Sequence, residues 1–493
     1  MTEHFLGIDV GTTATKAVVL DGHGKVLRRV RSPHLSALPV GAGRVDPTSW
    51  WASVEDACQA LNLGQNFPLK AIGLSVHSPV AVPLDTSGKH VSAGFRFETP
   101  ELIEVVRAVR NQLSREEMRC VGNRITPATF MSAAYTLMQQ KEPAAVQELA
   151  MLGAVGTYIG HRLTGEAVID PTQASYFGLF NSVNDWKWME SLAVRLRIPI
   201  GILPPIRPSL SPLGVLTADA ASTLRLPSGT PVTVGAGDTA CAAFAVKLES
   251  THDRLFTLGT THVVTDQGSL PASDNLHLQR ASIRRGSWLR HGVINGGLAL
   301  ATGARLLGYG AGSSAVPDMV EVARSASPEA LADAPFFVPH VRAERGPFWM
   351  ESPVSALTGM TADTGRAAAA WSIVEGVLFA DRLVAGSFND ATDKGLLLAG
   401  DLGGQQTFSQ FVADAFGIEV RLSDESHLPA VGAAMMAAEV HGTQAMPAVR
   451  VTDKIVPRDE YRKVIARRWP QFIKVRSRYL QDASQDRETT TGM

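Results

Sequence analysis

Short apolar runs separated by glycine-containing turns open the chain. Residues 5–10 and 17–20 are predicted to be two strands around a Gly11-Thr12-Thr13 turn, and residues 71–76 are predicted to be another strand. Short apolar runs bounded by turn residues are typical of buried strands. Between them, Asp46-Pro47 begins a helical pattern that continues to Ala57, with capping residues at its first turn. Because strands and helices alternate, we expect an α/β fold.

The opening pattern recurs in the second half of the chain. Residues 254–258 lead into a Gly259-Thr260-Thr261 turn, and a further apolar run follows at residues 262–264. Strand, Gly-Thr-Thr turn and strand therefore occur twice. The repeat predicts two similar halves that hold one nucleotide between them.

The domain boundary is predicted from a polar segment at residues 246–253, which separates the two halves. We expect an N-terminal domain over residues 1–248 and a C-terminal domain over residues 249–480. Residues 481–493 are polar and lack aromatic side chains, which predicts a disordered tail.

Length and composition narrow the class of protein. A chain of 493 residues is too long for one ordinary core, and its net charge of −1 favours neither nucleic acid nor a membrane surface as a partner. The cysteines, Cys58, Cys120 and Cys241, form no CxxC pair, which fits a reduced compartment. We see no signal peptide and no uncharged apolar stretch that spans a bilayer, so we expect a cytoplasmic protein. The oligomeric state stays open, a homodimer included.

Residues 235–238 place a carboxylate inside a glycine turn. An apolar run at residues 231–234 precedes the turn, and a helix of small residues follows it. Glycine lets the backbone approach a ligand closely, and the N-terminus of a helix attracts an anion. Asp238 is therefore the candidate catalytic base for a hydroxyl that attacks a phosphoryl group. The alternative is an aspartate that only caps the helix.

A second carboxylate, Asp9, ends the first strand next to the first Gly-Thr-Thr turn. Mg²⁺ prefers carboxylate oxygen together with phosphate and water, so Asp9 is a candidate metal ligand. The N–H groups and hydroxyls of Gly11, Thr12 and Thr13 can bind phosphate oxygens, and Lys16 can neutralise their charge. The alternatives are an aspartate bonded to its own turn and an exposed strand lysine.

Two further strand ends carry candidate residues. His77 follows the run at residues 71–76, at the end of the strand where α/β proteins place ligands, with a structural histidine as the alternative. The turn Gly400-Asp401-Leu402-Gly403 follows an apolar run and precedes an amphipathic helix from Thr407 to Phe416. Such a turn is typical of nucleotide binding, and an ordinary glycine-rich turn is its rival. The sequence contains no P-loop, nucleophile elbow or zinc motif.

The order and spacing of these motifs resemble the FGGY family of carbohydrate kinases. Residues 7–16 look like the first phosphate motif of that family, residues 235–238 like its catalytic motif and residues 258–261 like its second phosphate hairpin. The resemblance runs from about residue 5 to about residue 440 and includes segments at residues 161–175, 344–347, 375–377 and 431–434. It implies two α/β domains of the actin and hexokinase-like (ribonuclease-H-like) ATPase fold, with a cleft between them.

The resemblance also implies roles for single residues. Asp238 would accept the proton of a sugar hydroxyl, and Asp9 would help to hold Mg²⁺. Val76 and His77 stand where xylulokinases carry Met-His, so both are implied as sugar contacts. The remaining residues implied to contact ATP are Gly11, Thr12, Thr13 and Lys16 in the first half and Gly259, Thr260, Thr261, Gly400, Asp401 and Gly403 in the second half.

Departures from the family pattern leave open which sugar and which nucleotide the chain binds. Residues 95–98 read Phe-Arg-Phe-Glu where xylulokinases have Trp-Asn-Asp, and Glu98 is the candidate sugar contact there. The Arg-Glu pair of glycerol kinases is missing near His77, and Gly400-Asp401-Leu402 replaces the usual three glycines. The resemblance implies ATP- and Mg²⁺-dependent phosphorylation of a small sugar, a ketose such as D-xylulose or a related one, at a terminal hydroxyl. The alternatives are a kinase for another polyol or deoxy-sugar and a non-catalytic sugar- or nucleotide-binding regulator on the same fold.

Overall fold

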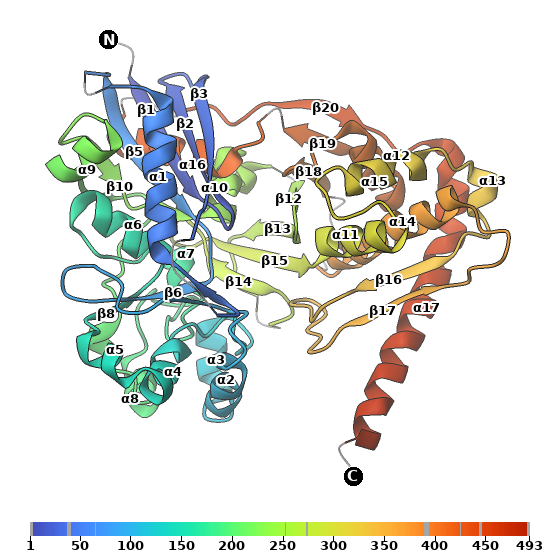
Figure 1. The fold of residues 1–493 in the computed structure, drawn as a ribbon, viewed down its shortest axis with the longest axis horizontal. Coiled ribbons are helices and arrows are strands. Elements are labelled where there is room, and N and C mark those ends of the chain that lie inside the picture. Colours follow the sequence, from blue (N-terminus) through green and yellow to red (C-terminus); the bar gives the residue numbers. More distant parts are fainter. Residues whose placement is uncertain are drawn as a thin grey trace.

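The computed structural model describes residues 3–36, 41–64, 66–251, 253–272, 275–388, 394–423, 425–442 and 446–490. These residues form two lobes, each built on a large mixed sheet (Figure 1). The chain passes from the first lobe to the second at η2 (Leu248–Ser250). This is the polar segment where the sequence predicts the domain boundary.

The sheet of the first lobe has β1 at its centre. Its strands, in spatial order, are β3 (Val26–Pro33), β2 (Ala14–Asp21), β1 (His4–Val10), β5 (Leu69–Val76), β10 (Pro231–Thr233) and β9 (Pro212–Val215), with β11 (Ala236–Gly237) beside β5. Helices α1 (Pro47–Leu61), α6 (Val155–Thr164) and α9 (Ala218–Leu224) share one apolar core with this sheet. The other face carries α10 (Asp238–Ala245) and α16 (Leu428–His441).

A smaller sheet and several short helices, mostly from the segment after β5, extend the first lobe. The smaller sheet has the order β4 (Arg44–Val45), β7 (Gly94–Arg96), β6 (Val80–Leu84) and β8 (Met151–Gly153). The short helices of this region are α2 (Leu102–Arg110), α3 (Arg115–Val121), α4 (Ala133–Lys141), α5 (Pro143–Glu148), α7 (Pro171–Ala174), α8 (Glu190–Arg195) and η1 (Ile200–Ile202).

The sheet of the second lobe has the order β14 (Leu278–Ala281), β15 (Trp288–Ile294), β13 (His262–Gly268), β12 (Asp253–Leu258), β18 (Gly395–Ala399), β19 (Val420–Ser423) and β20 (Val451–Ile455). A separate two-stranded sheet pairs β16 (Phe336–His340) with β17 (Val354–Thr358). The helices are α11 (Gly296–Leu306), α12 (Ala315–Arg324), α13 (Pro328–Leu331), α14 (Arg366–Gly386), α15 (Gln406–Phe416) and α17 (Asp459–Thr490).

The two large sheets repeat one topology. In the first lobe, β1 pairs antiparallel with β2 and parallel with β5. In the second lobe, β12 pairs antiparallel with β13 and parallel with β18. The Gly-Thr-Thr turns at residues 11–13 and 259–261 therefore occupy equivalent places, which confirms the repeat predicted from the sequence.

Helix α16 comes from the second half of the chain yet packs against β1 and β5 of the first lobe (Figure 1). Glycine on both strands permits this contact. A Cβ atom at Gly7 would lie 1.8 Å from the carbonyl oxygen of Ala430, and one at Gly73 would lie 1.8 Å from that of Ala433. The helix therefore ties the second half of the chain to the sheet that carries Asp9.

Helix α17 reaches residue 490, where the sequence composition predicts a disordered tail from residue 481. Residues 471–490 contain neither glycine nor proline, so nothing in that segment stops a helix once its first turns are packed on the second lobe. Residues 491–493 lie outside the described residues. Within the described part of the chain, no helix combines the length and apolar character needed to cross a bilayer.

Candidate active site

Asp9, His77 and Asp238 come from neighbouring strands of the first sheet. β1, β5 and β11 run parallel, and their register aligns the last residues of the three strands. Asp9 lies one residue before the end of β1, and the other two side chains directly follow β5 and β11. The carboxylate of Asp238 acts on the pKa of both Asp9 and His77, so all three groups are close in space.

Asp238 occupies the first turn of α10, and Gly237, not Asp238, is the N-cap residue. The Oδ1 atom of Asp238 accepts hydrogen bonds from the Thr239 amide at 2.6 Å and the Thr239 hydroxyl at 3.1 Å. Its Oδ2 atom receives no hydrogen bond from the residues that the structure describes. The half-buried carboxylate is thus oriented by one oxygen and keeps the other for a ligand.

A buried threonine holds the turn before Asp238. The Gly237 amide donates to Thr172 Oγ1 at 2.8 Å, and the Thr172 hydroxyl donates to Asp170 Oδ1 at 2.5 Å. Asp170 also caps α7. In the sequence, these residues belong to a segment that resembles the family, but no role is predicted for them. A polar pair at a helix start is common, so the local sequence carries no signal for this contact.

Asp9 is buried, and its Oδ1 accepts a hydrogen bond of 2.7 Å from the Ser75 hydroxyl. Burial, followed by the charge of Asp238, raises the pKa of Asp9 to about 6. Lys16, opposite Asp9 on β2, counteracts this shift. A divalent cation near both carboxylates would relieve their repulsion, which fits Mg²⁺.

The protein supplies an incomplete shell for that cation. Within the described ranges, no cluster of three or more His, Cys, Asp or Glu residues could hold a metal. Mg²⁺ is commonly bound by one or two carboxylates together with substrate phosphates and water. Asp9 therefore fits an ion whose remaining ligands come from a nucleotide and water, with the charge of Asp238 close enough to be felt at the same place.

His77 is buried at the end of β5, where its Nδ1 atom lies 3.0 Å from the carbonyl oxygen of Val10 and its ring packs edge-on against Trp50. Burial is the main reason that the pKa of His77 falls to about 4. The neutral ring donates through Nδ1, so its Nε2 is an acceptor, and no described residue donates to it. Val76 has its side chain in the core, and its backbone lies in the sheet between Val10 of β1 and Gly237 of β11.

Glu98 is distant in sequence from these strand ends but lies near the contact between the two lobes. Its carboxylate pairs with Arg96 at 2.7 Å, and the neighbouring Phe97 ring lies 4.9 Å from the guanidinium of Arg345, a residue of the second lobe. The departure at residues 95–98 therefore faces the second lobe.

Both Gly-Thr-Thr turns present threonine side chains. The first turn is closed by a 3.1 Å hydrogen bond from the Gly11 amide to Ala14, and the second by a 3.3 Å bond from the Gly259 amide to Thr261. The Leu298 amide, in the first turn of α11, donates to the Thr260 carbonyl at 3.0 Å. In the described parts of the chain, the four threonine hydroxyls of Thr12, Thr13, Thr260 and Thr261 make no hydrogen bond.

The turn at Gly400 lies beside the second Gly-Thr-Thr turn. Gly400 has a φ of +88°, and a Cβ atom there would lie 2.6 Å from the carbonyl oxygen of Leu258, the last residue of β12. The Leu402 amide donates to the same carbonyl at 3.3 Å. Asp401 is exposed and Gly403 is buried. The structure thus brings together the two segments of the second lobe that are predicted from the sequence to contact ATP.

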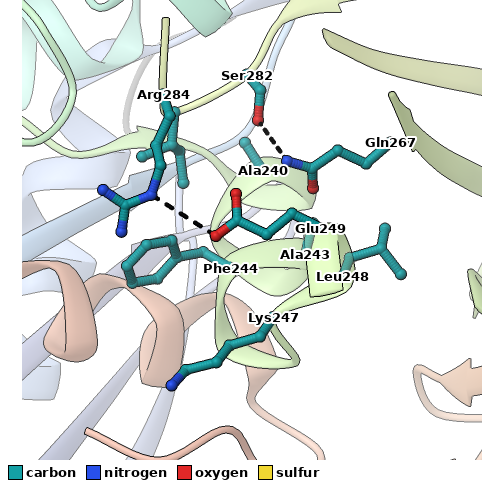
Figure 2. A pocket seen from close by; sticks show the side chains of 10 residues that line it. Ala240, Ala243, Phe244, Lys247, Leu248, Glu249, Gln267, Ser282 and Arg284 are labelled. Atoms are coloured by element: carbon teal, nitrogen blue, oxygen red, sulfur yellow. Dashed lines mark hydrogen bonds and ion pairs between the residues drawn. The ribbon is translucent and has the colours of Figure 1, made fainter. Parts of the chain in front are cut away.

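Figure 2 shows a pocket lined by one side of α10 and by the η2 segment that follows it. Its lining includes Phe244 and Lys247, and the Arg284 Nε atom lies 3.6 Å from Glu249 Oε1 within it. None of the predicted site residues that the structure describes lines this pocket. We therefore place the candidate site at the strand ends and not in this pocket.

Buried neutral histidines make the stability of the fold dependent on pH. The pKa of His77 is about 4 in the folded chain and about 6.5 when unfolded, so the unfolded state binds more protons between these values. Stability should therefore fall as the pH is lowered from 7 to 5, by about 2 kcal/mol from His77. In urea unfolding, His77→Asn should weaken the pH dependence of stability, because the titrating imidazole is removed. The fold should persist, since the Asn amide can still donate to the Val10 carbonyl. His23→Asn, at an exposed turn, is the control, and an equal effect of both variants would contradict the prediction.

Comparisons with known proteins extend over nearly the whole chain. Residues 4–245 match the model for the N-terminal domain of the FGGY family of carbohydrate kinases, and residues 246–439 match the model for its C-terminal domain. The chain is 23% identical to a xylulose kinase from Staphylococcus xylosus over 88% of this chain and 90% of that protein. It is 24% identical to a glycerol kinase from Thermococcus onnurineus over 96% and 98% of the two chains.

Solved structures show the same fold. A gluconate kinase from Lactobacillus acidophilus superimposes with a TM-score of 0.85 at 20% identity, covering 97% of this chain and 98% of that one. A xylulose kinase from Rhodospirillum rubrum gives a TM-score of 0.83 at 24% identity, covering 96% and 98%. The two-domain α/β fold expected from the sequence is thereby confirmed.

Proposed function

This chain belongs to the FGGY family of carbohydrate kinases, and from that premise we propose that it transfers the γ-phosphoryl group of ATP to a hydroxyl, the terminal one, of a small sugar. The observation that carries the proposal is the meeting of Asp9, His77 and Asp238 at three aligned strand ends. A carboxylate with one free oxygen, a neutral imidazole acceptor and a candidate metal ligand then lie at one junction.

Each group of site residues has its own proposed role in the phosphoryl transfer. The free Oδ2 of Asp238 accepts the proton of the attacking hydroxyl as the new O–P bond forms and the bond to the bridging oxygen of ADP breaks. The Nε2 atom of His77 accepts a hydrogen bond from another hydroxyl of the sugar. The amides and hydroxyls of the two Gly-Thr-Thr turns bind phosphate oxygens. The turn at Gly400 faces the adenosine of the same nucleotide. Mg²⁺, when bound, supplies positive charge that offsets the charge of the phosphates.

The acceptor is proposed at the level of a class. A ketose such as D-xylulose is the first compound to test, because Val76-His77 matches the xylulokinase pattern and xylulose kinases are among the relatives. Polyols and deoxy-sugars remain alternatives, because residues 95–98 depart from that pattern. A regulator without catalytic activity would not need the free carboxylate oxygen of Asp238.

An assay that couples ADP release to a colour change tests this function. Purified protein with MgATP should turn over at least one compound in a panel of ketoses, polyols, deoxy-sugars and sugar acids. The rate without acceptor gives the background. If MgATP binds but no acceptor gives turnover above background, the regulator becomes the better interpretation.

Thr260→Ala should raise the KM for MgATP about tenfold, since its hydroxyl is proposed to bind a charged phosphate oxygen. The backbone bond between Leu298 and Thr260 does not involve the side chain, so the fold of the turn should persist. Steady-state kinetics with varied MgATP measure the effect. Thr223→Ala, on the distant α9, is the matched control, and an unchanged KM in the Thr260 variant would remove the second turn from the proposed phosphate site.

A further inference from the structure

Arg280 reaches the candidate site from the second lobe. It lies on β14, the edge strand that extends towards the first lobe (Figure 1). Its Nη1 atom is 3.5 Å from the hydroxyl of Ser78, the residue after His77. A Cβ atom at Gly237, the residue before Asp238, would lie 2.8 Å from the same nitrogen. The guanidinium is therefore placed between the residues that flank His77 and Asp238.

The first lobe holds β14 on both sides of Arg280. The side-chain amide of Asn123 donates to the carbonyl of Gln279 at 2.6 Å and its oxygen accepts from the Gln279 amide at 2.8 Å. The Ala281 amide donates to the Ser175 hydroxyl at 3.0 Å. These contacts fix the backbone, so the guanidinium has a defined position before any ligand binds.

Among the residues that the structure describes, the charge of Arg280 has no anionic partner. The residue is 2% exposed, and within the described residues no carboxylate oxygen lies within 4.0 Å of its guanidinium. Its Nε atom donates to Nε2 of His291 at 2.8 Å. Burial, and then the charge of Arg280, hold the pKa of His291 well below its usual range, so this partner is neutral. The ring of Tyr176, 5.6 Å away, adds only a cation–π contact.

Burying an unpaired guanidinium costs several kcal/mol of stability. A bound anion would offset this cost, so a buried, unpaired Arg280 beside the candidate site favours an anionic ligand there. The Nη2 atom makes no hydrogen bond to any described residue, and Nη1 makes only the long contact with Ser78. Since Nε is already engaged, these two nitrogens are the donors left for a ligand. Their planar, forked geometry matches the two oxygens of a carboxylate.

Arg345 adds a second positive charge at the same place. Its guanidinium lies over the ring of Phe97. The backbone is fixed at Gly346, the residue after Arg345, whose carbonyl accepts a 2.8 Å hydrogen bond from the Val293 amide of β15. No carboxylate in the described ranges lies within 4.0 Å of its guanidinium. His291 and Tyr176, which contact Arg280, also interact electrostatically with Arg345, as do the carboxylates of Glu98 and Glu344. Two cations thus face one set of neighbours beside residues 95–98.

The neighbours of Arg280 indicate which anion it receives. The proposed phosphate contacts are the Gly-Thr-Thr turns, whereas Arg280 contacts Ser78, Tyr176 and the residue before Asp238. We propose that Arg280, supported by Arg345, binds a carboxylate of the acceptor, so that this enzyme phosphorylates a small polyhydroxy acid in preference to a neutral sugar. This inference rests on the proposed kinase function and changes the preferred acceptor from a neutral ketose to an acid.

Matched acceptors test the proposal directly. D-Gluconate, D-xylonate and D-arabinonate each have an alditol with the same carbon number, namely D-glucitol, xylitol and D-arabinitol, in which a CH₂OH group replaces the carboxylate. For the best pair, kcat/KM should favour the acid about 100-fold, as expected when a site built for a polar group meets an analogue that lacks it. Arg280→Gln should remove about 100-fold from the acid, mainly through KM, and change the alditol less than about threefold.

Two variants keep the result interpretable. Arg285→Gln makes the same replacement on the exposed turn after β14 and should leave the preference unchanged. Arg280→Lys keeps the charge without the fork and should give an intermediate KM. Because an unpaired buried charge is removed, the thermal midpoint of Arg280→Gln should equal or exceed that of the wild type.

The outcomes separate failure of this inference from failure of the proposed function. Turnover of ketoses or alditols at least as good as that of the acids, with Arg280→Gln lowering kcat equally for all acceptors, would assign the guanidinium to the transferred phosphoryl group and overturn the inference. No turnover of any acceptor would overturn the kinase function. In that case, a thermal shift by the acids in wild type, absent in Arg280→Gln, would still support a carboxylate site, and its absence would overturn that too.

Discussion

Asp238→Asn is expected to lower kcat about 100-fold or more while leaving the binding of MgATP nearly unchanged. The substitution keeps the shape of the side chain, and the amide oxygen can still accept the bonds from Thr239 that orient it. What is lost is a group that can take the proton of the acceptor hydroxyl. The effect should therefore lie in the chemical step and be seen in single-turnover as well as steady-state rates.

Asp219→Asn, in the first turn of α9, is the control for this prediction, since that helix lies away from the strand ends. Nucleotide affinity, measured by titration calorimetry, shows whether the variant keeps its binding site. A kcat within about threefold of the wild type, with affinity intact, would remove Asp238 from its proposed role.

Local sequence was sufficient to predict the strand–turn–strand units and the first helix. A Gly-Thr-Thr turn between two apolar runs depends on neighbours in the chain, and β1–β2 and β12–β13 form as expected. The start of α1 is equally local, because Asp46 caps it by accepting a 2.9 Å bond from the Thr48 amide. Such features need no knowledge of the tertiary fold.

The meeting of the site residues was only partly predictable. The sequence places Asp9, His77 and Asp238 at strand ends, but only the register of β1, β5 and β11 brings them to one level. Arg280 could not be found in this way, because a polar residue in a short edge strand ordinarily faces solvent. Its burial results from contacts with the first lobe, far away in the sequence. The reach of α17 to residue 490 was not predictable for a related reason, since the composition after residue 481 does not reveal that this segment continues a helix.

A buried ion pair in the second lobe leads to the second prediction of a large effect, a loss of stability. Arg468 of α17 is fully buried and binds Glu375 of α14 through its Nε atom at 2.8 Å and its Nη2 atom at 2.6 Å. Its remaining donors bond the carbonyls of Leu331, Ala334 and Pro335 at 2.8 to 3.0 Å. The pair explains a carboxylate in the middle of the apolar helix α14.

Arg468→Met should lower the stability of the second lobe by about 3–5 kcal/mol, because it leaves the Glu375 carboxylate buried without a partner. Three carbonyls lose their donors as well, so the loss should exceed that of Glu375→Gln, which leaves those bonds in place. The double variant should lose less than the sum of the two single changes, since neither charge then remains unpaired.

Urea unfolding measures these losses, with hydrogen exchange of peptides from α14 and α17 to assign them to the second lobe, because a two-domain chain can unfold in more than one step. Arg467→Met, on the exposed side of the same helix turn, should change the stability by less than about 0.5 kcal/mol. If the two arginine variants unfold at the same urea concentration, the buried pair does not stabilise the contact between α14 and α17. If the double variant loses the full sum, the two side chains act independently despite their contact.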